Sequence, residues 1–198
     1  MSRLEKREYA AYTIRPRIHR LLPDYLRAFS MPALHRRWTS PLPEWHTEVV
    51  PQDIDGLVAQ CDIDHSVRPS TAYRGGSKAA HERLELFLDR KLEDYASHRN
   101  EPSHHATSNL SPYLHFGHIS SLEIALAARE HARTRKFSAD AFLEELIVRR
   151  ELAFNFARFA PRCDSLEVLP SWVQETLAEH ARDERYPEYT TYRLEHCE

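Results

Sequence analysis

The sequence predicts a mainly α-helical protein, and three observations carry that prediction. Only four of the 198 residues are glycine and long β-branched runs are few, which disfavours a β-sandwich or barrel. From residue 75 onward, apolar side chains recur at helical spacing, and helix-capping signals recur along the same stretch. No alternation of strand and helix patterns indicates a parallel sheet.

The first 74 residues divide into two parts. Residues 1–38 resemble helical pieces broken at Pro16, Pro23 and Pro32, because proline lacks the N–H that a helix interior needs. Residues 38–74 carry four more prolines and an acidic run, which favours a long, partly extended connector.

A helix is predicted at about 78–97, where five apolar side chains fall on one face: Leu84, Phe87, Leu88, Leu92 and Tyr95. By spacing alone, Tyr95 belongs to the core. A polar loop follows at 99–110. Ser111 and Pro112 then predict an N-cap and a first helical residue, and Gly117 ends that short helix.

Serine residues mark the next helix starts. Ser120 with Glu123 predicts a capping box and a helix to about Arg133. Ser138 is expected to cap a helix whose apolar stripe is Phe142, Leu146, Ala153 and Phe156. Ser171 with Gln174 predicts a last capping box, opening a helix that reaches His180.

Composition excludes several classes of protein. No apolar run approaches the roughly 18 residues that span a bilayer, and the charged start is not expected to act as a secretory signal. The three cysteines Cys61, Cys163 and Cys197 are far apart, so a reducing, intracellular compartment is expected. The net charge of −3 hides nine Lys/Arg against five Asp/Glu in residues 1–50, and this balance neither demands nor excludes nucleic acid.

The loop Thr107-Ser108-Asn109-Leu110-Ser111 offers hydroxyl and amide groups just before a helix start. Such a place suits an anion, for example a phosphate or pyrophosphate. Plain helix capping explains the same residues, and by pattern alone it is the simpler interpretation.

Ionisable residues on an otherwise apolar helix form a second candidate. Glu145 and Arg149 are four residues apart, so they either pair in solvent or face a ligand together. The basic set Arg15, Arg17, His19 and Arg20 either contacts phosphates or forms a solvated helix face. The thirteen histidines show no metal-ligand spacing, and no metal site is expected.

Two ordered motifs resemble the class II cyclobutane pyrimidine dimer photolyases. The first is Tyr95-x-x-x-Arg99-Asn100-x-Pro102 with the stretch from Thr107 to Ser120, and the second runs from Glu144 to Ala153. Shorter matches occur at 8–19, 164–167 and 170–172, so the resemblance covers nearly the whole chain in register.

The resemblance implies a domain plan. Residues 1–40 would be the tail of an α/β antenna domain, 41–74 the interdomain connector, and 75–198 the first half of a helical FAD-binding domain. The second half of that domain and the start of the antenna domain have no counterpart in the chain.

The resemblance also implies a chemistry. Reduced, anionic FAD would use light to split cyclobutane dimers in ultraviolet-damaged DNA, in a soluble, cytoplasmic DNA-repair lyase with a possible antenna chromophore. Whether this chain is itself an enzyme stays open. The alternative is a remnant that binds damaged DNA or a separately encoded C-terminal half without turnover.

Site residues follow from the resemblance position by position. Tyr95 and the loop Thr107, Ser108, Asn109, Leu110 and Ser111 would hold FAD, and Glu145 would be the catalytic carboxylate at the dimer's base edge. Arg149 and Asn155 would contact the substrate. Phe154 departs from the pattern, because relatives typically carry Asp there.

Overall fold

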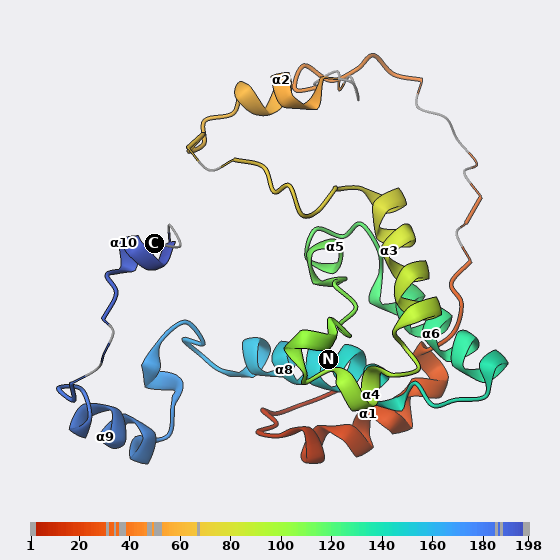
Figure 1. Cartoon of the computed structure of the whole chain (residues 1–198). Coiled ribbons are helices and arrows are strands. Elements are labelled where there is room, and N and C mark those ends of the chain that lie inside the picture. The colour runs from red at the N-terminus through yellow and green to blue at the C-terminus, as the bar shows by residue number, and fades with distance from the viewer. Residues whose placement is uncertain are drawn as a thin grey trace. The chain divides into compact units, whose positions relative to one another are not determined.

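The computed structural model describes residues 3–30, 32–33, 35, 39–46, 49, 53–66, 68–184, 186 and 188–195. Within these ranges the regular structure is helical and no strand occurs, which confirms the predicted fold class (Figure 1). The elements are α1 Ala11–Tyr25, α2 Ile54–Ala59, α3 Ser77–Arg90, α4 Tyr95–His98, α5 Ser111–His115, α6 Ser121–Arg135, α7 Asp140–Leu143, α8 Arg150–Phe159, α9 Ser171–Glu179 and α10 Thr191–Glu195. A π-helical turn, Glu144–Arg149, joins α7 to α8, and short 3₁₀ turns lie at Pro102–His104 and Leu166–Val168.

The described residues group into two compact units, one within 1–20 and 147–198 and the other within 21–146. These units are defined by contacts between residues of the chain. The domain boundaries expected at residues 40 and 74 stay a prediction. No helix among the described residues is long and apolar enough to cross a membrane.

Helix α1 runs through two prolines, so the predicted breaks at Pro16 and Pro23 are wrong. The carbonyl that Pro16 leaves without a helical donor belongs to Tyr12, whose side chain is exposed, so water can reach it. The helix also buries Ala11, Ile14 and Ile18 on one face. That burial offsets the lost hydrogen bond, because fully burying an isoleucine is worth about 2 kcal/mol. Pro32 lies in irregular chain.

The single helix predicted at 78–97 is two helices, α3 and α4, separated by a turn. The backbone N–H groups of Lys91 and Leu92 both donate to the Phe87 carbonyl, which closes α3 at Arg90. Leu84, Phe87 and Leu92 are buried as predicted, whereas Tyr95 is only half-buried.

Local capping rules succeed at the end of α5 and at the start of α6, but the predicted N-cap of α5 is wrong. Gly117 ends α5 with φ +68°, a conformation that costs glycine little, and the His118 N–H donates to the Tyr113 carbonyl at 2.8 Å. Ser120 Oγ accepts from the Glu123 N–H at 3.0 Å, as predicted. Ser111 is the first helical residue rather than the N-cap, which is Leu110.

The helix after Ser138 contains an unpredicted π-helical turn. The N-cap of α7 is Ala139, so the predicted cap at Ser138 is wrong, although Ser138 Oγ accepts from the Asp140 N–H at 3.1 Å. Phe142 and Leu146 are buried as expected. An extra residue in a helical turn rotates every later side chain by about 100°. Consequently Ala153 is exposed and Asn155 is fully buried, so the predicted apolar stripe is wrong beyond the turn.

The connector and the last capping box also differ in detail. Residues 54–59 of the connector form α2, and the described residues around it are irregular and exposed. The helix after Ser171 exists, but its N-cap is Pro170 and no side chain caps it. Gln174 Nε2 instead donates to the Leu169 carbonyl at 2.8 Å, so that capping box is wrong.

Candidate functional site

Three aromatic rings from three helices support the site in the unit 21–146. Phe87 of α3 is fully buried, and its ring centroid lies 4.7 Å from that of Phe142 in α7. The Tyr95 ring of α4 meets both edge-on, at 5.9 Å from Phe87 and 5.4 Å from Phe142. Edge-to-face packing of this kind adds to the burial energy and holds each ring in one orientation.

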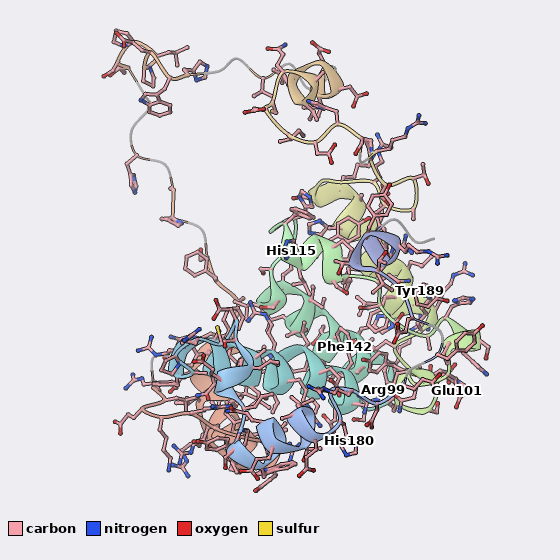
Figure 2. The ribbon with its side chains drawn as sticks, turned by 90° about the vertical axis from the view of Figure 1, so that its left-hand side faces the viewer. Arg99, Glu101, His115, Phe142, His180 and Tyr189 are labelled. Atoms are coloured by element: carbon pink, nitrogen blue, oxygen red, sulfur yellow. The ribbon has the colours of Figure 1, made fainter. Side chains whose placement is uncertain are left out.

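Arg99 joins Tyr95 to Glu145. Its Nη1 donates to Glu145 Oε1 at 2.7 Å, and its Cζ lies 5.9 Å from the Tyr95 ring centroid. Figure 2 shows Arg99, the C-cap residue of α4, in the same region as Phe142 of α7, three residues before Glu145. The structure therefore brings Tyr95 and Glu145 together through a residue that the sequence interpretation did not assign to the site.

Electrostatics keep Arg99 and Tyr95 protonated. The hydrogen bond from Arg99 to Glu145 is the main cause that raises the pKa of the guanidinium. Partial burial raises the pKa of the Tyr95 phenol, against the opposing effect of Arg99. At neutral pH the site therefore presents a guanidinium and a neutral phenol beside the Glu145 carboxyl group.

The π-helical turn Glu144–Arg149 sets the direction of Glu145. Such turns are rare and occur frequently at functional sites, because they aim side chains that a regular helix would direct elsewhere. The Glu145 side chain is 39% exposed, so a ligand can still reach the carboxyl group while Arg99 holds Oε1. The turn ends at Arg149, whose side chain is exposed.

The loop Thr107–Ser111 is held mainly by its own side chains. Ser108 Oγ accepts from the Leu110 N–H at 3.3 Å, and the Thr107 hydroxyl donates to Asn109 Oδ1 at 3.3 Å. Asn109 has φ +55°, and Leu110 is buried, so the loop has a defined shape. Lys91 Nζ, just after the end of α3, donates to the Thr107 carbonyl at 3.4 Å and to the His105 carbonyl, before the loop, at 2.6 Å. These hydrogen bonds do not extend to Arg99 or Glu145.

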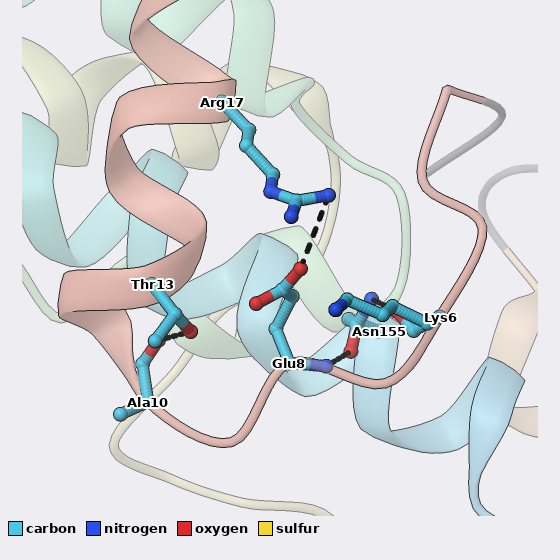
Figure 3. Close-up of polar contacts among 6 residues, drawn as sticks. All are labelled: Lys6, Glu8, Ala10, Thr13, Arg17 and Asn155. Carbon is cyan, nitrogen blue, oxygen red and sulfur yellow. Dashed lines mark hydrogen bonds and ion pairs between the residues drawn. The ribbon is translucent and has the colours of Figure 1, made fainter.

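Asn155 lies in the other unit and is used inside the protein. Its Oδ1 accepts from the Glu8 N–H at 2.6 Å, and its Nδ2 donates to the Lys6 carbonyl at 3.0 Å (Figure 3). The Glu8 carboxylate, also buried, pairs with Arg17 at 3.3 Å. Both ends of the Asn155 amide therefore hold the N-terminal segment against α8.

The sequence interpretation missed Arg99 and Lys91 as site residues. Arg99 follows Tyr95 by four residues, a spacing that places both side chains on one helix face, and this was the available signal. No local pattern relates Lys91 to the loop, because its partner carbonyls lie 14 and 16 residues away.

No model of a known protein family matches the chain. Curated relatives match almost all of it. Deoxyribodipyrimidine photo-lyase from Oryza sativa subsp. japonica is 39% identical over 97% of this chain and 38% of the relative. The proteins of the same name from Methanothermobacter thermautotrophicus and Potorous tridactylus are 38% and 36% identical over 96% of this chain. They are covered over 40% and 35% of their own length.

Almost the whole chain is thus similar to one part of these deoxyribodipyrimidine photo-lyases, and it spans less than half the length of these relatives. The resemblance read from the motifs at 95–120 and 144–153 is confirmed.

Proposed function

We propose that this chain forms part of the catalytic domain of a class II photolyase, which splits cyclobutane pyrimidine dimers in DNA with light and FAD. The supporting observation is the alignment of 96–97% of the chain with proteins named deoxyribodipyrimidine photo-lyase. The proposal includes ultraviolet-damaged DNA as substrate and an intracellular, cytoplasmic location.

The loop Thr107–Ser111 fits the phosphate and ribitol groups of FAD chemically. Thr107 and Ser111 are exposed, so their hydroxyl groups can reach a ligand. When bound, the reduced flavin would supply an electron to the dimer and receive it back after the ring splits. Tyr95 would border the flavin, with its ring orientation set by Phe87 and Phe142.

Glu145 would orient the dimer by hydrogen bonding to a base edge. Arg99 engages Oε1, which leaves Oε2 to accept a hydrogen bond from an N–H of the flipped base. The neighbouring guanidinium also supplies positive charge where the dimer gains negative charge. Arg99 thereby acts on Glu145 as a positioning residue.

Arg149 and Asn155 are assigned different roles. Arg149 is exposed and can meet the DNA backbone. Asn155 is fully buried and engaged with Lys6 and Glu8, so we assign it the positioning of α8 rather than direct substrate contact.

A binding-only function is the second candidate. The observation in its favour is coverage, since the chain matches only 35–40% of the length of the curated relatives. Under this alternative the chain binds damaged DNA or a complementing chain without turnover.

The test combines this chain with the rest of a relative. The matching segment of the Oryza sativa protein is replaced by this chain, and the chimera is reconstituted with FAD. Under blue light we expect loss of the dimers in irradiated oligothymidylate, measured by recovery of absorbance at 260 nm. A folded chimera that binds FAD and damaged DNA but repairs nothing in light supports the binding-only function.

Variants of the chimera assign the residues. Glu145→Ala is expected to lower the repair yield at least tenfold, and Glu145→Gln less, because the amide keeps one acceptor oxygen. Thr107→Ala with Ser111→Ala is expected to weaken FAD binding, measured by flavin fluorescence. Ser103→Ala, at an exposed position in the neighbouring loop, is the control and is expected to change neither. Unchanged repair in Glu145→Ala would contradict the role of that residue.

A further inference from the structure

Lys91 holds two backbone carbonyl groups beside the start of the loop Thr107–Ser111. It is the C-cap residue of α3 and is partly buried. Its Nζ donates to the His105 carbonyl at 2.6 Å and to the Thr107 carbonyl at 3.4 Å. These two carbonyls lie on either side of Ala106, which is buried. Lys91 therefore joins the loop to a helix that the fully buried ring of Phe87 anchors in the core.

The backbone around this loop is unfavourable by itself, so an external anchor matters. His105 and Asn109 have φ values of +47° and +55°, in the left-handed region that residues with side chains disfavour. The two hydrogen bonds made within the loop are both 3.3 Å long. A hydrogen bond from an ammonium group to a carbonyl is shorter and stronger than one between neutral groups. The 2.6 Å contact of Lys91 therefore restrains this stretch more firmly than the loop's own bonds do.

The contact with Thr107 also sets the direction of the next N–H group. In a planar trans peptide the N–H points opposite to the carbonyl of the preceding residue. Because the Thr107 carbonyl accepts from Lys91, the Ser108 N–H points away from Lys91. Among the residues that the structure describes, this N–H meets no acceptor, so it can donate to a ligand oxygen. Lys91 thus orients a donor of the loop that is proposed to hold the phosphate groups of FAD.

We propose that Lys91 is a positioning residue for cofactor binding, because its ammonium group holds the loop Thr107–Ser111 in the shape that receives the phosphate groups of FAD. The inference rests on the proposed function and adds a residue to it that contacts the loop rather than the flavin. Order that exists before a ligand arrives lowers the entropy lost on binding. Loss of the ammonium group should therefore loosen the loop and weaken cofactor binding, without changing the chemistry of cofactor that is already bound.

The first test is hydrogen exchange of the full chain without FAD, followed by mass spectrometry of the peptide that covers residues 106–114. Lys91→Met keeps the unbranched stem but removes the charge and the donors, and it is expected to speed exchange of this peptide about tenfold. Lys91→Arg keeps a cation that donates, and it is expected to stay within about threefold of the parent. Lys78→Met, at an exposed lysine of the same helix, is the control and should leave the exchange unchanged. Equal exchange in Lys91→Met and the parent would overturn the inference.

The second test measures FAD affinity and repair separately, in the chimera with the Oryza sativa protein. Lys91→Met is expected to weaken FAD binding about tenfold, measured by flavin fluorescence. Repair per bound FAD under blue light should stay within about twofold of the parent, because Lys91 acts through the loop. Lys91→Arg should restore most of the affinity, and Lys78→Met should change neither quantity.

The outcomes separate this inference from the proposed function. If the parent chimera binds FAD and Lys91→Met binds it equally well, the inference is overturned and the proposed function stands. A tenfold fall in repair per bound FAD would also overturn it, since Lys91 would then act in the chemistry. A parent chimera that binds no FAD would overturn the proposed function and this inference together. Circular dichroism verifies that each variant is folded, and Lys91→Gln, which also lacks the charge, takes the place of Lys91→Met if that variant is unfolded.

Discussion

The Arg99–Glu145 pair and the Asn155 amide both fix a helical segment through polar contacts between distant residues, but they leave their polar groups in different states. Glu145 keeps a side chain that is 39% exposed, and one of its oxygens is held at 2.7 Å by Arg99. Asn155 is completely buried, and both ends of its amide are used by Lys6 and Glu8. A polar residue suited to a ligand keeps a reachable atom, whereas one that serves stability does not.

The largest effect is expected from the aromatic rings that support the Arg99–Glu145 pair. Phe87→Ala removes a fully buried ring that both Tyr95 and Phe142 contact, and should lower the free energy of unfolding by about 3–5 kcal/mol. Urea denaturation measures the change. Phe116→Ala, at a ring that is 71% exposed, is the matched control and should cost less than about 1 kcal/mol. Equal losses would contradict the position of Phe87 in the core.

Asn155→Ala tests the contribution of the buried Asn155 amide to stability. It leaves the buried Glu8 N–H and the Lys6 carbonyl without their partner, so stability should fall by about 2–4 kcal/mol. Asn100→Ala, at an exposed asparagine, should change stability by no more than about 0.5 kcal/mol. If Asn155→Ala were as stable as the parent, the amide would not hold the N-terminal segment.

The Arg99–Glu145 pair should contribute less to the free energy of unfolding than the Asn155 amide does. A double-mutant cycle of Arg99→Ala and Glu145→Ala should give a coupling free energy of about 1 kcal/mol, because both side chains are partly exposed and screened. Thermal unfolding of the four proteins measures it. A coupling as large as the loss in Asn155→Ala would place Glu145 among the structural residues instead.

The smallest effect is a pH dependence at His81, which bridges α3 and α6. His81 Nε2 contacts Glu123 Oε1 at 2.7 Å, and hydrogen bonds to the Ser77 carbonyl and to Glu123 raise the pKa of the imidazole above 6.5. A raised folded-state pKa stabilises the fold below the unfolded pKa, and this gain is lost as pH rises through the folded value. The Tm difference between the parent and His81→Asn should therefore be greatest near pH 5.5 and shrink above neutrality. A constant difference across that range would contradict the contact.

The Arg99–Glu145 pair should be unchanged over the same pH range. The pKa of Arg99 is raised, mainly by its hydrogen bond to Glu145, so the guanidinium stays charged. Comparing the double-mutant cycle at pH 6 and pH 8 therefore distinguishes the two pairs.

The sequence by itself determined those features of the structure that depend on residues close together along the chain. Gly117 ends α5 because only a residue tolerant of positive φ fits there, and Ser120 starts α6 because its hydroxyl reaches an N–H three residues on. The helical class follows from the same short-range rules. The motifs at 95–120 and 144–153 were enough to indicate the resemblance to photo-lyases, since the order of side-chain types along a chain needs no coordinates.

Tertiary structure alone decided the features that depend on distant partners. Pro16 lies inside α1 because burial of Ile14 and Ile18 outweighs a missing hydrogen bond, and no local rule contains that gain. Because of the π-helical turn, Asn155 rather than Ala153 lies on the buried face of the helix. Arg99 donates a hydrogen bond to Glu145, which is 46 residues away in the sequence. Such contacts depend on how the helices pack, which is why the resemblance could name Glu145 whereas its contact with Arg99 came only from the structure.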